Sequence, residues 1–222
     1  MYIYIFLIIS IILSLYAQYK VKTNFTEYTK VHSSSNMTGA QVAKLMLDRR
    51  GVYDVSVQPV AGVLTDHYDP RSKTVRLSEE VYDKTSISAV SVAAHEVGHA
   101  LQHNEQYAFL SFRSALAPVA SFASKFVYIL IVLGFLLEMM QLVDFAILAF
   151  SAAVLFQIIT LPVEFNASKR ALANLQADGV LAVDEVGSSK KVLGAAALTY
   201  VAATAVSVVN LARLIIMRNS RD

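Results

Sequence analysis

Four long apolar segments constrain the fold of this chain more than any other feature of its sequence. The first, residues 2–19, contains no charged residue and is about long enough to cross a bilayer. Two further segments follow at residues 126–143 and 145–163, and an alanine-rich segment follows at residues 192–217. The composition agrees, because 55% of the 222 residues are hydrophobic and the mean hydropathy is +0.50. We therefore expect an integral, multi-pass membrane protein that contacts lipid; for the last segment, packing along the other helices is the alternative.

The first apolar segment has the features of an uncleaved anchor rather than of a signal peptide. No basic residue precedes it, and Leu15 occupies a position at which cleavage before Gln18 would need a small residue. Only residues 138–144 separate the cores of the second and third segments, which predicts a helical hairpin that returns the chain to the side it left. Most of the 19 basic residues lie in residues 20–125 and 165–191 and none lies in the hairpin turn, which favours a cytoplasmic location for these two regions. The basic C-terminus conflicts with this orientation, because it would face outward if the segment at residues 192–217 crosses the membrane.

The region after the anchor has the pattern of a small folded domain. A short amphipathic helix is expected to end at Gly51. Three short strands are expected next, with a turn at residues 68–71 between the last two; they cover residues 54–60, 62–67 and 73–77. A helix from about Ile87 through Gln106 then follows, with Ser86 and Ser88 as candidate caps.

This last helix contains the sequence His95-Glu96-Val97-Gly98-His99. On a helix, the four-residue spacing stacks the two imidazoles one turn apart on one face, where both can bind a single metal ion. Glu96 then lies beside that ion and can take a proton from a metal-bound water, which is the chemistry of the H-E-x-x-H zinc motif. The alternative is an accidental match, which the presence of only 5 histidines in the chain makes rare. Gly98 leaves room beside a metal for close backbone packing.

A catalytic zinc site needs three protein ligands, and this motif supplies two. The chain has no cysteine, so the third ligand must be a histidine or a carboxylate. The metzincin pattern fails, because its glycine and third histidine are replaced by Gln102 and Glu105. His103 lies about 12 Å along the helix from His95, too far to share one ion, so we expect it to pack or to support a ligand.

Glu164 is the best placed candidate for the third ligand, because the hairpin returns it to the side of the membrane that holds the motif. Pro162 favours a helix start just before it, and Ser168, one turn later, could form a hydrogen bond with a ligand. The alternative for Glu164 is a surface carboxylate near a helix N-terminus. Three weaker rivals for the ligand position are Asp178, Asp184 and Glu185.

Residues 66–70, Asp-His-Tyr-Asp-Pro, are a second place for chemistry. Asp66, His67 and Tyr68 lie where an expected edge strand ends ahead of the motif helix. His67 or Tyr68 could donate a hydrogen bond to the oxyanion that forms on an attacked carbonyl. The alternative is a tight turn whose residues only satisfy type I geometry.

Several blocks of this sequence, together with the N-terminal anchor, resemble the YugP-type bacterial membrane zinc metallopeptidases over nearly the whole chain. The blocks cover residues 62–70, 74–78, 92–100, 161–165 and 195–203. The resemblance implies a gluzincin-like membrane peptidase of the bacterial plasma membrane, related in logic to membrane peptidases of the HtpX type. In that type a Glu-x-x-Ala-Asp pattern brings the third ligand, and its aspartate supports a ligand histidine. The matching stretch here is Glu164-x-x-Ala167-Ser168, which supports Glu164 as a ligand and has serine in place of the aspartate.

These patterns predict an α+β membrane protein in which a small zincin-like domain is joined to a bundle of about four transmembrane helices. The domain consists of a helix, three strands and the active-site helix, and by fold analogy an edge strand would pair with an extended peptide beside the metal. The expected regions are an anchor at 1–19, the catalytic domain at 20–125, a transmembrane hairpin at 126–163, the helix with the third ligand at 164–191 and a last transmembrane helix at 192–217.

The expected function is a zinc-dependent endopeptidase that acts on peptide or protein substrates, with Zn²⁺ held by His95, His99 and Glu164 and with Glu96 as the base. A different class of function is a catalytically inactive membrane scaffold or peptide-binding protein with a structural metal. An intramembrane site-2 protease is disfavoured, because polar residues follow the motif directly. The net charge of +2 gives no sign of a nucleic-acid surface.

Overall fold

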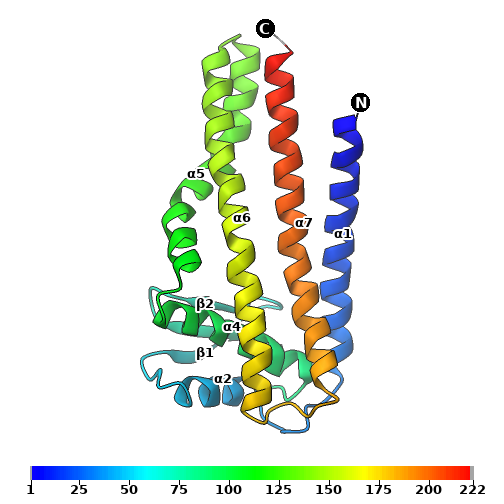
Figure 1. Ribbon diagram of the computed structural model, residues 1–222, viewed down its shortest axis with the longest axis vertical. Helices are drawn as coiled ribbons and strands as arrows, with labels where there is room; N and C mark the ends of the chain where they lie inside the picture. Colours follow the sequence, from blue (N-terminus) through cyan, green and yellow to red (C-terminus); the bar gives the residue numbers. More distant parts are fainter. Residues whose placement is uncertain (1, 221–222) are drawn as a thin grey trace. The chain divides into compact units, whose positions relative to one another are not determined.

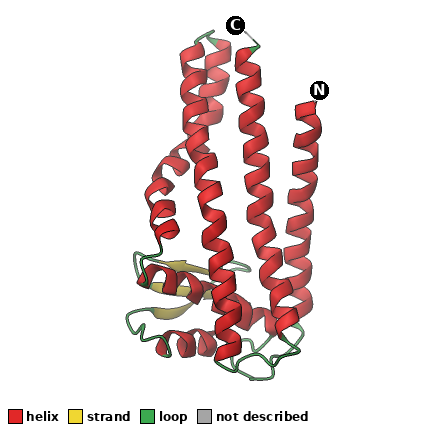
Figure 2. Cartoon of the chain, in the orientation of Figure 1, coloured by secondary structure: helices red, strands yellow, loops and turns green. Residues whose placement is uncertain are grey.

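The computed structural model describes residues 2–220, and most of them are helical (Figures 1 and 2). The helices are α1 (Tyr2–Thr29), α2 (Gly39–Asp48), α3 (Glu79–Tyr82), α4 (Ile87–Asn104), α5 (Ala108–Leu136), α6 (Met140–Ala177) and α7 (Val186–Asn219). The strands are β1 (Ser56–Val60), β2 (His67–Asp69) and β3 (Thr74–Ser78). This confirms the expected mixture of a small sheet with long apolar helices.

The chain forms two units, each built from segments that are distant in sequence. One contains the described part of residues 1–17 with residues 108–162 and the described part of 199–222. The other contains residues 18–107 and 163–198. The units do not follow the linear order of the chain, because α1, α6 and α7 each contribute residues to both.

The four longest helices are apolar enough to cross a membrane. They cover Ile3–Thr29, Ala108–Leu136, Met140–Ala177 and Val186–Asn219, and the share of buried residues in the most apolar window of each is only 11 to 28%. Apolar side chains that face outward along the full length of a helix need a lipid environment. The chain is therefore a multi-pass membrane protein, as the sequence predicts.

Helix α6 departs from the expected pattern, because it continues without a break from Met140 to Ala177. The helix start expected at Pro162 is wrong, since this proline lies inside α6. Proline is favoured in the first turn of a helix, but an apolar membrane helix also tolerates it in the interior. Glu164 therefore lies within a long helix, and the helical register of α6 sets the direction of its side chain.

The second unit contains the three-stranded sheet, in the order β1-β3-β2. Strand β3 pairs in parallel with β1 and antiparallel with β2, so that Val75 lies opposite both Val57 and Tyr68. The strand expected at residues 62–67 is wrong in its bounds, because β2 begins at His67. The backbone is left-handed at Gly62 (φ 108°) and Leu64 (φ 57°), which interrupts an extended strand there.

The turn between β2 and β3 begins later than the sequence pattern predicts and is held by Asp69. The Asp69 carboxylate accepts hydrogen bonds from the Arg71 backbone N–H at 3.0 Å and from Ser72 Oγ at 2.7 Å. Arg76 Nη1 also donates to it, at 3.0 Å, from strand β3. Asp69 therefore ends β2 and fixes the tight connection to the central strand.

Helix α4 forms the centre of this unit. Its N-cap is Ser86, whose side chain accepts a hydrogen bond from the Ala89 backbone N–H at 3.1 Å, as the sequence predicts. Most of its residues are buried, so the helix is covered by protein on nearly every side. Its neighbours in the core come from α2, β3 and the part of α6 after Pro162, and they include Val42, Met46, Val75, Leu77, Ala171 and Leu175.

Candidate metal centre

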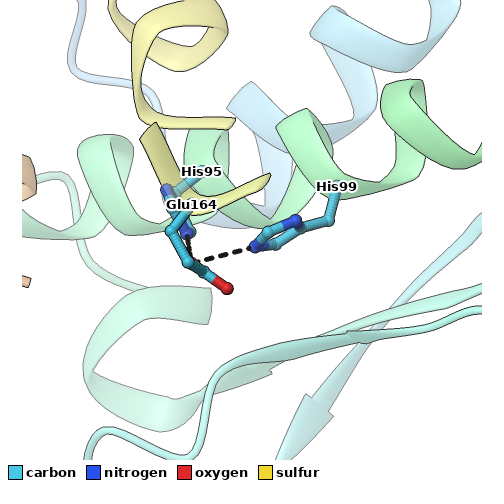
Figure 3. Close-up of side chains that lie close together, drawn as sticks. All are labelled: His95, His99 and Glu164. Carbon is cyan, nitrogen blue, oxygen red and sulfur yellow. Dashed lines mark hydrogen bonds and ion pairs between the residues drawn. The ribbon is translucent and has the colours of Figure 1, made fainter. Parts of the chain in front are cut away.

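Three side chains from α4 and α6 converge at one point in this unit (Figure 3). His95 and His99 lie one turn apart on α4, and Glu164 approaches them from α6. The Oε2 atom of Glu164 lies 3.3 Å from Nε2 of His95 and 3.5 Å from Nε2 of His99. The ligand atoms of the three residues all lie within 4.8 Å of one another. The structure thus brings together the three residues that the sequence proposes as ligands.

The two helices approach closely at this point because both present small residues. Gly98 faces the backbone of Ala167, and a Cβ atom added at Gly98 would lie only 2.8 Å from the Ala167 carbonyl oxygen. Ala167 itself is fully buried. Because Ala167 follows Glu164 by three residues, this contact lets the Glu164 carboxylate reach the two imidazoles.

Each of the two histidines also has a polar partner at Nδ1, the ring nitrogen that does not face Glu164. Ser168 Oγ lies 3.1 Å from Nδ1 of His95, which agrees with the role proposed for Ser168. Gln102 Oε1 lies 3.0 Å from Nδ1 of His99. With Nδ1 engaged in each ring, Nε2 is the nitrogen that faces the centre. Sequence reasoning did not find Gln102; its signal was a polar residue one turn after His99 on a face that must be buried.

Two carboxylates determine the charge balance around His99. Burial opposes a charge on His99, but its hydrogen bond with Glu164 and the charges of Glu96 and Glu164 outweigh burial and raise the pKa of the His99 imidazole. Glu96 is nearly buried, with 8% of its surface exposed, on the same helix as the two histidines. Two carboxylates beside two imidazoles favour a cation at this point.

The donor set fits zinc. Two imidazole nitrogens and one carboxylate oxygen could be the three protein ligands of a catalytic zinc site. His99 and Glu164 are buried, and His95 is partly exposed. Two of the three other acidic candidates are engaged elsewhere, and the third, Asp184, is exposed. Asp178 pairs with Arg49 and Arg50, and the Glu185 carboxylate accepts hydrogen bonds from Ser34.

The residues of the Asp66–Pro70 stretch have several different roles. The Asp66 carboxylate accepts hydrogen bonds from the backbone N–H and the hydroxyl of Ser78, and burial raises its pKa. His67 is exposed, and its Nδ1 lies 2.7 Å from the Thr65 carbonyl oxygen. Tyr68 is half-buried, and its hydroxyl lies 2.8 Å from Nδ1 of His103 at the end of α4. Burial raises the pKa of Tyr68 to about 12, so its hydroxyl stays protonated near neutral pH.

Comparison with known proteins agrees with this geometry. The model of a family described as "Putative neutral zinc metallopeptidase" matches residues 3–219. The chain belongs to this family. Within it, the chain is 53% identical over 221 residues to the "Putative membrane protease YugP" of Bacillus subtilis (strain 168), which covers 99% of this chain and 98% of that protein. No solved structure matches the chain.

Membership of a zinc metallopeptidase family connects the cluster of His95, His99 and Glu164 with zinc. A zinc peptidase family implies zinc, and the described residues provide one group, His95, His99 and Glu164, that could hold it. The family match also extends over the four apolar helices, so the membrane segments belong to the same architecture as the site.

Proposed function

We propose that this protein is a zinc-dependent membrane endopeptidase, in which His95, His99 and Glu164 hold the metal and Glu96 is the catalytic base. The observation that carries the proposal is the convergence of three candidate ligand atoms within 4.8 Å. Two of them lie on α4, which also carries Glu96, a nearly buried carboxylate outside the ligand set. A structural zinc site has four protein ligands and needs no base, so this arrangement favours catalysis over a purely structural metal.

The role of Glu96 follows from its position next to a ligand. Zinc held by the three side chains would act as a Lewis acid, polarising the scissile carbonyl and lowering the pKa of water. The Glu96 carboxylate takes a proton from the attacking water while a bond forms between the water oxygen and the peptide carbonyl carbon. When the carbon–nitrogen bond breaks, Glu96 returns this proton to the leaving amine, so the residue ends the cycle ionised again.

Substrate binding is proposed to use the sheet edge nearest the site. Strand β2 is an edge strand, and the Tyr68–His103 contact ties it to the end of α4. An extended peptide that pairs with an edge strand presents its backbone in a fixed register and leaves its side chains to neighbouring pockets. The substrates proposed here are therefore peptides or proteins that offer an extended segment.

We also propose that the site faces the cytoplasm from a bacterial plasma membrane. The distribution of basic residues supports this orientation, and the relative from Bacillus subtilis supports the bacterial membrane. The basic C-terminus is weaker evidence against this orientation than its charge suggests, because one of its arginines is in an ion pair. Arg218 is paired with Asp144, at 2.8 Å, at the end of the α5–α6 hairpin.

Two substitutions test the function. Glu96→Gln keeps the size of the side chain but removes its basicity, so we expect bound zinc at the wild-type level and loss of peptide cleavage by a factor of about 10² or more. Glu164→Ala removes one ligand, so we expect loss of both zinc and cleavage. The measurements are metal content and cleavage of a mixed peptide library by purified protein. Wild-type cleavage by Glu96→Gln would refute the proposed base, and unchanged zinc in Glu164→Ala would remove Glu164 from the ligand set.

A further inference from the structure

Gln102 is a fully buried polar residue that the proposed chemistry does not use. It lies on α4 one turn after His99, with 0% of its surface exposed. Its side-chain amide takes part in three hydrogen bonds. Oε1 lies 3.0 Å from Nδ1 of His99, and Nε2 donates to the Val163 carbonyl oxygen at 2.8 Å and to Oδ1 of Asn166 at 2.9 Å.

These partners fix the orientation of the amide. The Val163 carbonyl can only accept a hydrogen bond, so the group that faces it must be the NH₂ group of Gln102. The carbonyl oxygen of Gln102 must then face His99. Because that oxygen can only accept, Nδ1 of His99 must carry the hydrogen. The lone pair of the neutral imidazole is consequently on Nε2, the atom that lies 3.5 Å from Glu164.

The other two contacts of Gln102 lie on either side of Glu164 in α6. Val163 directly precedes Glu164 in α6, and Asn166 follows it by two residues. The same amide thus holds the backbone and a side chain on both sides of the third ligand. Asn166 Oδ1 also accepts from Arg170 Nε at 2.7 Å, and Arg170 pairs with Glu105, which follows α4, at 2.7 Å. A continuous chain of polar contacts therefore runs from buried His99, through Gln102, Asn166 and Arg170, to exposed Glu105.

Ser168 differs from Gln102 in what it determines. A hydroxyl can either donate or accept, so the contact between Ser168 and His95 is compatible with both tautomers of that ring. Each of the two side chains forms a hydrogen bond with one proposed ligand, Ser168 with His95 and Gln102 with His99. Of the two, only Gln102 fixes a tautomer, and only Gln102 reaches from α4 to the residues on either side of Glu164.

We propose that Gln102 is a positioning residue that sets the tautomer of His99 and the placement of Glu164 together, so that one side chain prepares two of the three ligands for the metal. This rests on the proposed ligand set. Groups that support metal ligands in this way change metal affinity or activity by about 10- to 100-fold when they are removed.

The first test replaces Gln102 by methionine, which has a similar length and no hydrogen-bonding amide. In purified full-length protein, we expect zinc affinity, measured by competition with a chelator, to fall about 10- to 100-fold. At saturating zinc we expect kcat to fall while KM changes little, because Gln102 contacts His99 and the helix that carries Glu164 rather than the substrate. Gln176→Met on the exposed side of α6 is the matched control, with wild-type affinity expected. Wild-type zinc affinity in a folded Gln102→Met variant would overturn the proposal.

A pair of substitutions at Asn166 tests the same contacts with Gln102 in place. Asn166→Asp keeps the oxygen that accepts from Gln102 and Arg170, so it should retain wild-type affinity. Asn166→Leu removes that oxygen and should weaken zinc binding, by about 10-fold. Equal affinities in the two variants would overturn the proposal, even if Gln102→Met failed to fold.

A spectroscopic measurement addresses the tautomer directly. In zinc-loaded protein with ¹⁵N-labelled histidine, NMR should place the ring hydrogen of His99 on Nδ1, and a hydrogen on Nε2 would contradict the proposal. The outcome for the proposed function is separate. Wild-type protein that bound no zinc would overturn both proposals, whereas wild-type protein that bound zinc and cleaved peptides, with Gln102→Met binding zinc equally well, would overturn only this one.

Discussion

Substitution of Gly98 by alanine tests whether the close approach of α4 and α6 builds the site. An added Cβ would lie 2.8 Å from the carbonyl oxygen of Ala167 and 3.2 Å from its Cα. Carbon–oxygen contacts in proteins normally begin at about 3.3 Å. The two helices must therefore separate by about 0.5 Å at this point, because the atoms in contact are backbone and cannot rotate away.

This displacement is large compared with the tolerance of a metal site. Metal–ligand distances are normally held to about 0.2 Å, and Ala167 lies less than one turn from Glu164. We expect zinc affinity to fall about 10- to 100-fold, as for the loss of a group that orients a ligand. Overpacking costs about 1–3 kcal/mol, and the better helix propensity of alanine offsets about 0.5–1 kcal/mol of this. The expected net loss of stability is thus about 0–2.5 kcal/mol.

The assay compares Gly98→Ala with Gly194→Ala in purified protein, with zinc affinity measured by chelator competition and stability by thermal unfolding. Gly194 lies within α7, and no atom lies within 4 Å of an added Cβ there. This control should keep wild-type zinc affinity and gain about 0.5–1 kcal/mol of stability. If Gly98→Ala bound zinc as tightly as the wild type, close helix packing would not be what positions Glu164, and the reasoning would fail.

Two further predictions concern pH and orientation. In metal-free protein the folded-state pKa of His99 is raised. The contribution of His99 to stability should therefore be complete below its unfolded pKa of about 6.5, and it should be lost as the pH rises through the folded-state pKa. Thermal unfolding of wild type and His99→Gln at several pH values, with chelator present, measures this contribution. With zinc present the trend should reverse, because protons compete with the metal as the pH falls. For orientation, the cysteine-free chain allows single cysteines at Val183, in the α6–α7 loop, and at Leu137, in the α5–α6 turn. A membrane-impermeant maleimide applied to intact cells should label Leu137→Cys and not Val183→Cys, and the opposite pattern would place the site outside the cytoplasm.

The sequence predicts this site well where chemistry constrains residue type at short range. The spacing of His95 and His99 requires only a helix to bring both imidazoles to one face, and the structure shows that helix. The prediction of Glu164 required a longer-range argument, because this residue reaches His95 and His99 only if the chain returns through the α5–α6 hairpin. That step was predictable because a short turn between two apolar segments leaves one arrangement in a bilayer.

Other features depended on long-range contacts and could not be predicted. Strand β2 was misplaced because left-handed residues at Gly62 and Leu64 interrupt a stretch that is otherwise typical of a strand. The helix break expected at Pro162 is absent, since local preference cannot show that a proline lies in the middle of a membrane helix. Gln102 was missed because a glutamine one turn after a ligand becomes informative only when its partners on α6 are known.

The rotation of α6 about its own axis explains why these long-range contacts matter for function. Glu164, Ala167, Ser168 and Ala171 are spaced by three or four residues, so they lie on one face of α6. A rotation of the helix by one residue, about 100°, would turn Glu164 and Ser168 away from both histidines. The contact at Gly98 opposes this rotation, because only a small residue of α6 fits against it. Gln102 also opposes it, through its hydrogen bonds to Val163 and Asn166 on either side of Glu164. The proposed ligand set therefore depends on the steric contact at Gly98 and on the polar contacts of Gln102 and Ser168 between α4 and α6, and loss of the Gly98 or the Gln102 contact should weaken metal binding without any change to a ligand.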